Sequence, residues 1–297
     1  YGTGSANAAV TNANLTINGG TIDGVKYQGV DKSAVAVLGG GIAKGTKATA
    51  NAITTNTVIN GGTITGDVVA GGLADGGTAP VGTANVTLKG GSIDGKVTVG
   101  SANATITLDG TGAEVTGDFE GNKNSTLAFN NYNAKFDKTA TGFDTLSVAE
   151  GSNVEMDNLS TGAKGTPDTS NPNADKGFFG DGSNVTVNGK GTVTATNVTA
   201  TGGKTITVAD GGTLDAGKLT TTAEGGTAGT VKTEGLGSTL VIGNAQDALD
   251  SIDDDSLSST VGSEIKFTGL GESVAASTIT GKLQGQHGHR QCGRYQG

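Results

Sequence analysis

The sequence predicts an all-β chain folded as a parallel β-helix, that is, a β-solenoid with irregular loops. The first observation is a repeated phrase: LTINGGTIDG at residues 15–24 returns as TVINGGTITG at 57–66, as VTLKGGSIDG at 86–95 and, more loosely, as ITVADGGTLDAG at 206–217. A repeated strand–turn–strand unit is typical of solenoid proteins. The second is composition, because the 297 residues include 54 Gly but only 3 Pro and 1 Cys. The repeat therefore determines the expected fold class.

The repeated phrase has a direct structural interpretation. Val86 and Leu88 alternate with Thr87 and Lys89, so one set of side chains can point inward and the other toward solvent. A Gly-Gly pair tolerates positive φ and turns the chain, either within a solenoid coil or in a β-hairpin. The flanking runs are short, which favours the faces of a β-helix. The predicted structural turn glycines are Gly19, Gly20, Gly61, Gly62, Gly90, Gly91, Gly211 and Gly212.

The coil length follows from the apolar residue that precedes each turn. These markers are Ile17, Ile59, Leu88, Leu108, Val148, Val187, Val208, Val241 and Phe267. Successive markers are 42, 29, 20, 40, 39, 21, 33 and 26 residues apart. Several intervals lie near 20 or twice 20, which predicts roughly 10 to 13 coils of about 20 residues with loops inserted in some of them.

One stretch is expected to leave the coil pattern as a loop. Residues 160–177 hold two of the three prolines and no large apolar residue. This composition predicts a long protruding loop or, alternatively, a boundary between two halves of the solenoid.

A second stretch shows helical periodicity. Residues 244–255 begin with Asn244 as an N-cap and predict one short helix. Its apolar face comprises Ala245, Ala248, Leu249 and Ile252. The acidic run 253–255 could bind a cation, but it fits a solvated face better because no calcium-loop spacing surrounds it.

Composition and charge exclude several classes of function. A net charge of −9 and 17 singly scattered Lys argue against a nucleic-acid partner. The apolar runs are too short to insert into a membrane. With 33% hydrophobic residues the chain approaches the composition of disordered proteins, but scarce Pro and thinly spread charge favour order. Because the chain opens at Tyr1 without a signal sequence, it is expected to be a fragment.

The last twelve residues differ from the rest in composition. All His and Arg residues and the single Cys lie within 286–297. Codons for this segment, read one nucleotide later, can encode the sequence NTGTGNVVGIK. Its residue types match the composition of residues 1–285. We therefore predict a frameshift near Gln286 and an out-of-frame disordered tail. The alternative is a metal-binding tail through His287, His289 and Cys292, but three ligands without a fourth make a weak site.

Residues suited to catalysis are scarce. Without His, Cys or Arg before the tail, general acid–base chemistry would depend on carboxylates, Lys and Tyr. The pairs Asp94 with Lys96 and Asp215 with Lys218 leave open a carboxylate-dependent, polysaccharide-degrading enzyme. Such pairs also arise by chance on a polar surface. We expect a non-enzymatic protein with no catalytic, cofactor-binding or metal site.

Two further groups have alternative interpretations. The aromatic residues Phe119, Phe129, Tyr132, Phe136 and Phe143, and likewise Phe178 and Phe179, are predicted to be large core residues or, alternatively, an exposed contact surface. The alternating threonines Thr192, Thr194 and Thr196 could form part of an ice-binding face, although Thr favours any solvated strand.

The phrases VINGGTITGDVVAGGLADGG and VTLKGGSIDGKVTVG resemble the repeats of bacterial autotransporter passenger regions and related β-helical surface proteins. The resemblance covers most of residues 1–285 and is strongest before Gly117. It implies a right-handed parallel β-helix, export through an outer-membrane β-barrel that this chain lacks, and display at the cell surface. The leading hypothesis is an adhesin or structural stalk whose inserted loops bind host or matrix glycans or proteins.

Overall fold

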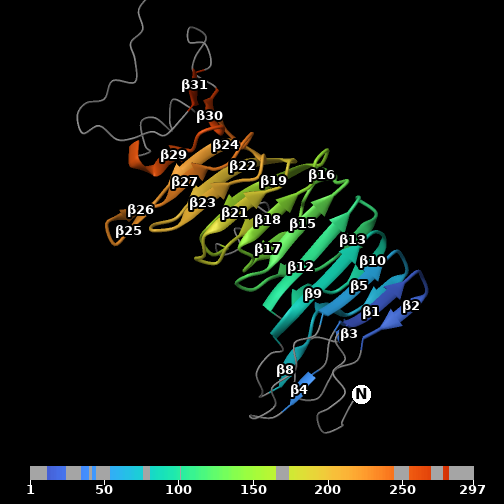
Figure 1. Ribbon diagram of the computed structural model, residues 1–297. Coiled ribbons are helices and arrows are strands. Elements are labelled where there is room, and N and C mark those ends of the chain that lie inside the picture. Colours follow the sequence, from blue (N-terminus) through green and yellow to red (C-terminus); the bar gives the residue numbers. More distant parts are fainter. Residues whose placement is uncertain are drawn as a thin grey trace, which may run out of the picture.

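The computed structural model describes residues 12–24, 35–39, 42–44, 54–75, 81–100, 102–164, 174–243, 254–268 and 277–280. It is a right-handed parallel β-helix in which strands of successive coils pair side by side (Figure 1). The predicted fold class is therefore confirmed. The chain winds through three sheets, named here A, B and C, and a coil contributes one strand at a time to each sheet it crosses.

Every pairing within sheet A is parallel. Its ten strands are β1 (Asn12–Ile17), β5 (Thr54–Ile59), β9 (Val81–Leu88), β12 (Ala102–Asp109), β15 (Thr126–Asn130), β18 (Thr145–Val148), β21 (Val185–Asn188), β23 (Thr205–Val208), β27 (Thr230–Thr233) and β29 (Leu257–Ser259).

Sheet B occupies only the early coils. Its four strands are β2 (Thr21–Asp23), β6 (Thr63–Thr65), β10 (Gly91–Asp94) and β13 (Ala113–Val115). The short pairs outside the three sheets are the parallel β4 (Ile42–Lys44) with β8 (Leu73–Asp75) and the antiparallel β25 (Ala223–Glu224) with β26 (Thr227–Ala228).

Sheet C runs the length of the solenoid. In order of pairing its strands are β3 (Val35–Leu38), β7 (Asp67–Ala70), β11 (Val97–Val99), β14 (Phe119–Glu120), β17 (Thr139–Thr141), β20 (Gly177–Phe179), β19 (Asn153–Ser160), β22 (Thr192–Ala200), β24 (Thr213–Thr221), β28 (Thr239–Ile242), β30 (Glu264–Phe267) and β31 (Ser277–Thr280), with β16 (Asn133–Lys135) beside β19. Strand β31 pairs antiparallel with β30 and so ends the parallel ladder.

The core consists of side chains that alternate inward along each strand and stack in register from coil to coil. One such column in sheet A contains Ile17, Ile59, Leu88, Leu108, Phe129 and Val148. Each is at most 7% exposed. Because apolar side chains stack on apolar side chains, every coil has the same cross-section. Burial of apolar surface and backbone hydrogen bonding between strands therefore stabilise the same register between coils.

The aromatic group lies inside this core. The ring centroids of Phe129 are 4.9 Å from Tyr132 and 5.4 Å from Phe136, and those of Phe119 and Phe136 are 5.6 Å apart. Phe143 is fully buried as well. The prediction of large core residues is confirmed, and the alternative of an exposed aromatic contact surface is wrong.

The coil markers require two corrections. Val187 is in register with Leu146 and not with Val148, so Val187 and Val208 continue the neighbouring inward column of sheet A. Val241 and Phe267 lie in β28 and β30 of sheet C, so they do not continue the sheet A column. The interval of 40 residues between Leu108 and Val148 spans two coils, with Phe129 as the marker between them. The last sheet A strands instead present Thr233 and Ser259 inward. The pattern failed there because the inward residue is polar.

Two predictions fall mainly or wholly outside the described residues. Of the helix expected at 244–255, the structure describes only a 3₁₀ turn at Asp254–Ser256, which leads into β29. The proposed out-of-frame tail at 286–297 lies entirely outside the described part of the chain.

Candidate functional site: the insertion on sheet C

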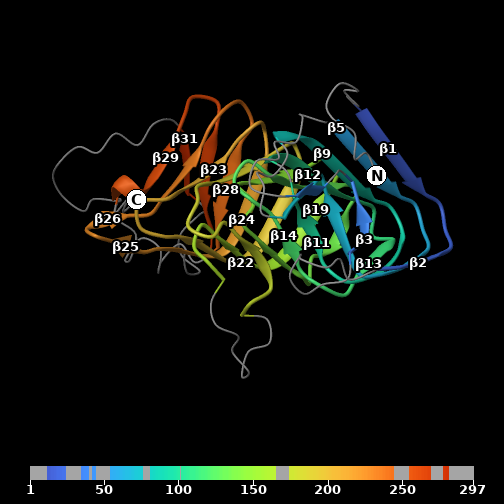
Figure 2. The same cartoon turned by 90° about the horizontal axis from the view of Figure 1, so that it is seen from below.

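The most distinctive feature of the described chain is an insertion between β19 and β20. After β19 the chain leaves sheet C and returns to add β20 between β17 and β19. Phe178 of β20 stands in register with Ala140 on one side and with Leu159 on the other. In Figure 2 the coloured chain on both sides of residues 165–173 leads away from the solenoid at one place.

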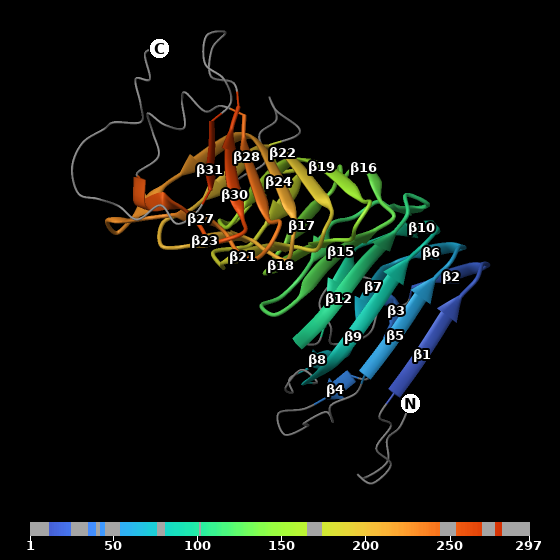
Figure 3. The same cartoon turned by 45° about the horizontal axis from the view of Figure 1, so that its top comes forward.

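The solenoid ladder continues past this insertion. Strand β18 pairs with β21 in sheet A, and β19 pairs with β22 in sheet C. Sheet C thus carries one strand more than sheet A across the same coils. Strands lie about 4.8 Å apart within a sheet, and facing sheets lie about 10 Å apart. One extra strand in sheet C is therefore expected to tilt the solenoid axis by roughly 25° toward sheet A. Figure 3 shows the early sheet A strands at one end and β24, β28 and β30 at the other.

Hydrogen bonds fix the returning end of the insertion. The Asn158 side chain donates through Nδ2 to the carbonyls of Ala174, at 3.3 Å, and Lys176, at 2.8 Å. Thr139 donates through Oγ1 to the Asp175 carbonyl at 2.7 Å. These donors come from β19 and β17, the two strands that flank β20, so the solenoid itself positions this end.

The departing end is fixed as firmly. Thr161 is fully buried, and its Oγ1 lies 2.9 Å from that of Thr201 and accepts the Thr201 backbone N–H at 2.8 Å. The Lys164 ammonium lies 3.7 Å from an Asp118 carboxylate oxygen and 3.9 Å from one of Asp175. The Lys164–Asp175 ion pair therefore holds the two ends close to one another.

Strand β20 is packed into the core. Phe178 is fully buried, with its ring centroid 6.2 Å from that of Phe143, and Phe179 is only 5% exposed. Both are core residues, as one of the two interpretations predicted. Gly177 has φ +123°, and a Cβ there would come within 2.1 Å of the Asn158 carbonyl oxygen. Only glycine fits this close approach.

One carboxyl group beside the insertion has a shifted pKa. Partial burial raises the pKa of Asp181, while the backbone N–H and the positive charge of Lys164 oppose that rise. A raised pKa is the property a general acid requires. However, the only charged side chain that contributes to this shift is the Lys164 ammonium and not a second carboxylate, and the ion pairs of that ammonium are with Asp118 and Asp175.

The two carboxylate–lysine pairs named for the enzymatic alternative have other partners or no ion pair between them. Asp94 accepts a hydrogen bond from Thr116 Oγ1 at 2.9 Å, while the Lys96 ammonium lies 2.5 Å from Glu120. That hydrogen bond raises the pKa of Lys96, away from the neutral range that a general base needs. In the part of the chain that the structure describes, no ion pair joins Asp215 to Lys218 on β24.

The threonines considered for ice binding lie on β22 of sheet C. Thr192 stacks between Asn153 and Thr213, and Thr194 stacks between Glu155 and Asp215. Thr196 is exposed where the long strand bends. The alternation within the segment is real, but the neighbouring coils place carboxylates beside it.

The predicted turn glycines lie in the turn between each sheet A strand and the strand that follows it in the coil. Gly20, Gly62 and Gly91 stack on one another with φ of +91°, +103° and +90°. A Cβ on Gly91 would lie 2.7 Å from the Gly62 carbonyl oxygen. Gly19, Gly61 and Gly90 precede them, and Gly211 and Gly212 occupy the turn between β23 and β24. These glycines shape the coil rather than bind a ligand.

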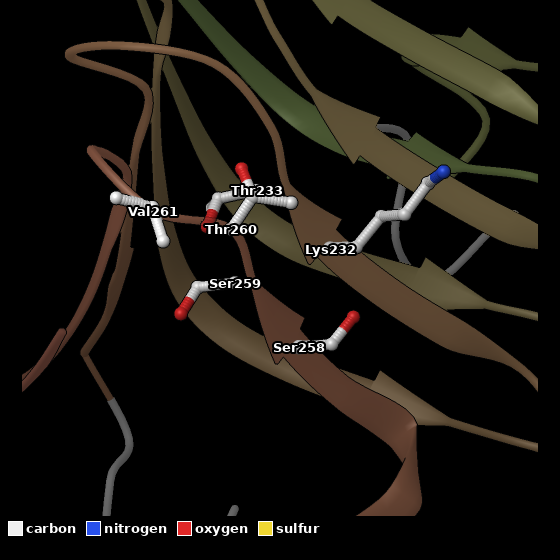
Figure 4. A pocket seen from close by; sticks show the side chains of 6 residues that line it. All are labelled: Lys232, Thr233, Ser258, Ser259, Thr260 and Val261. Atoms are coloured by element: carbon white, nitrogen blue, oxygen red, sulfur yellow. The ribbon is translucent and has the colours of Figure 1, made fainter. Parts of the chain in front are cut away.

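A pocket of about 300 Å³ lies where β27 and β29 end (Figure 4). Its lining comprises Lys232, Thr233, Ser258, Ser259, Thr260 and Val261. The lining has hydroxyls and one ammonium but neither a carboxylate nor an aromatic ring, so it offers no acid–base pair and no surface for stacking a sugar.

Among the residues that the structure describes, His, Cys, Asp and Glu form no group of three or more that could hold a metal ion. His287, His289 and Cys292 lie outside those residues. Nor does the described part contain a helix long and apolar enough to cross a membrane.

Comparison with protein families, curated proteins and solved structures found no match to this chain.

Proposed function

We propose that this chain is a non-enzymatic, surface-displayed β-solenoid that serves as an adhesin or as a structural stalk, with recognition made by inserted loops. The observation that carries the proposal is the insertion on sheet C, whose two ends are held by Asn158, Thr139 and Thr161 of the solenoid. Loops placed on a rigid scaffold are common recognition elements. Fixing both ends lowers the entropy lost when such a loop binds a partner.

The ionisable groups support a role in binding more than one in catalysis. Lys96 is paired with Glu120, which raises its pKa, and Lys164 opposes the rise in the pKa of Asp181. The pairs named from the sequence are separated or engaged with other partners. A carboxylate-dependent enzyme would need two such groups converging on one substrate.

The resemblance to autotransporter passengers supports the location that we propose, outside the cell and attached to its surface. In that arrangement the full-length protein has a C-terminal β-barrel in the outer membrane, and the host or matrix glycans and proteins are the partners. The parallel β-helix of the described residues is compatible with this plan.

A binding screen tests the adhesin role. The native chain and a variant with residues 165–173 replaced by a Gly-Ser segment of equal length would be tested on glycan and matrix-protein arrays. We expect binding by the native chain and loss of binding by the variant, because the ends of the insertion and β20 are retained. A matched control replaces the Gly225–Gly226 turn of the β25–β26 hairpin and should bind normally. If the native chain bound nothing, adhesion would be rejected in favour of the stalk.

A degradation assay separates the enzymatic alternative. Polysaccharide cleavage that is abolished in Asp94→Asn or Asp215→Asn, with unchanged thermal unfolding, would favour the carboxylate enzyme over our proposal. We expect no cleavage by the native chain.

A further inference from the structure

The outer face of sheet A carries a stacked column of polar side chains that sequence spacing conceals. Register pairs each member with the next: Asn14, Asn56, Asn85, Thr105, Thr126, Thr145, Thr186 and Thr207. Two residues further along each strand a second column holds Thr16, Val58, Thr87, Thr107, Ala128, Ser147 and Asn188. These side chains are partly or fully exposed.

Neither column contains a charged residue, although the chain has 28 acidic residues and a net charge of −9. Charge returns in the first column only at Lys232 of β27, and the Lys89–Asp109 ion pair lies at the margin of the face. Two copies of an acidic protein repel one another. That repulsion is smallest where they meet through a face without charge.

The same face is complementary to itself. Hydroxyl and amide groups each donate and accept hydrogen bonds, so a copy of the face offers partners for every group. Both copies also share one repeat of about 4.8 Å along the column, which keeps these groups matched over many strands. The amides are already ordered, because Asn56 donates to Asn14 and Asn85 donates to Asn56, each at 2.9 Å.

We propose that sheet A is a self-association surface, at which a second copy of this chain stacks face to face through a two-fold axis parallel to the columns, so that each strand meets its own counterpart. An isologous contact of this kind uses the same patch on both copies. The proposal goes beyond recognition by the insertion, and the pairwise contact does not depend on surface display.

The bend at β20 limits the size of this contact. A tilt toward sheet A makes that face concave at the insertion, and two concave faces cannot meet along their whole length. The strands from β1 to β18 give a flat region of about 29 Å by about 16 Å. Burying roughly 900 Å² in total places the contact among weak, transient interfaces. Many copies on one surface would gain strength by avidity.

Charge substitution and complementation test the proposal. Sedimentation velocity over a concentration series would compare the native chain with Thr126→Lys/Thr145→Lys and with Thr126→Glu/Thr145→Glu. We expect the native chain to dimerise reversibly and each variant to associate at least about tenfold more weakly, because like charges then meet. An equimolar mixture of the two variants should regain association, because opposite charges then meet.

A matched control uses a stacked pair on the outer side of sheet C, Thr192→Lys/Thr213→Lys, which should dimerise like the native chain. Circular dichroism and thermal unfolding verify that every variant is folded. A native chain that stays monomeric throughout the series overturns the proposal, as does a folded mixture that fails to associate. A monomeric native chain that halts ice growth, with loss in the Thr126→Lys/Thr145→Lys variant, would assign the face to ordered water instead.

The insertion variant distinguishes this proposal from the adhesin role. Replacing residues 165–173 should abolish binding to glycans or matrix proteins and leave self-association unchanged. Loss of both properties in that variant would contradict the assignment of self-association to sheet A.

Discussion

The coils before and after the insertion bury the same kind of core but turn between their second and third faces in different ways. In the early coils a glycine separates sheet B from sheet C, as Gly95 does between β10 and β11. In the later coils one long strand, such as β22 or β24, continues through the bend. A parallel β-helix therefore needs inward alternation in every coil, whereas the corner can be made by glycine or by a bent strand.

The two corners place different demands on the sequence. A Cβ on Gly95 would lie 2.4 Å from the Gly66 carbonyl oxygen, and one on Gly117 would lie 2.5 Å from that of Gly95. In the late corner the side chains of Thr196 and Asn197 are exposed. The early corner thus allows close approach of successive backbones, while the late one leaves room for side chains on β22 and places Gly217 at the bend of β24.

The largest expected effect is at the early corner. Gly95→Val forces a side chain against the backbone of the preceding coil and should lower the free energy of unfolding by about 4 kcal/mol or more. Thr196→Val at the late corner should change it by less than about 0.5 kcal/mol, because the position is exposed. Chemical denaturation of both variants measures the difference, and equal losses would contradict the distinction between the two corners.

The extra strand at the junction of the two regions is expected to depend on its buried ring. Phe178→Ala should cost about 3 to 5 kcal/mol through lost burial and a cavity beside Phe143. Phe178→Leu retains most of the apolar volume and should cost about 1.5 kcal/mol or less. Thermal unfolding of the two variants gives the comparison. A small loss in Phe178→Ala would show that β20 can detach without disturbing the coils.

Hydrogen bonds between outward-facing side chains should contribute less to the free energy of unfolding than the early corner or the buried ring of Phe178. Asn56→Ala breaks two ladder bonds in the early coils and should cost about 1 kcal/mol. In the later coils Thr205→Ala removes one hydroxyl contact with Thr230, at 2.7 Å, and should cost about 0.5 kcal/mol. Urea denaturation would report both values, and a greater loss for Thr205→Ala would reverse the expected order.

The smallest effect concerns two carboxyl groups, one in each region. A hydrogen bond from Asn131 is the main cause that lowers the pKa of Asp109, whereas a hydrogen bond from Lys266 is the main cause that lowers the pKa of Glu264. Since salt screens charges but not a neutral donor, 1 M salt (about 3 Å Debye length) should raise the pKa of Glu264 more than that of Asp109. NMR titration measures both.

The sign of the linked stability follows from the direction of these shifts. Because each folded pKa lies below its ordinary value, the contribution is fully present above that value, 3.8 for Asp109 and 4.5 for Glu264. It is lost as pH falls through the lowered folded pKa. An NMR titration that placed either pKa at or above its ordinary value would contradict that assignment.

Sequence reasoning worked best where a local pattern and the fold agree. Alternation around Val86 and Leu88 correctly gave inward and outward faces, and the coil length of about 20 residues holds between Leu108 and Phe129 and between Phe129 and Val148. It failed at Val241 and Phe267, because an apolar residue before a turn has the same local pattern in sheet C as in sheet A.

The candidate site was only partly predictable. Two prolines and small polar residues indicated a loop near 160–177, but not that the chain would re-enter sheet C as β20. The intervals near 40 illustrate the difficulty. The one from Leu108 to Val148 covers two ordinary coils, while the 39 residues from Val148 to Val187 hold one coil with the insertion. Spacing alone does not distinguish them.

By itself, the sequence determined the all-β class, the inward faces and the positions of the glycine turns, because alternation and permissive φ act over a few residues. Tertiary structure decided which residues of different coils stack, where β20 enters sheet C, and that threonines from Thr105 to Thr207 form one charge-free column on sheet A. Those outcomes depend on register between segments about 20 to 40 residues apart, and register is fixed by backbone pairing and core packing between coils.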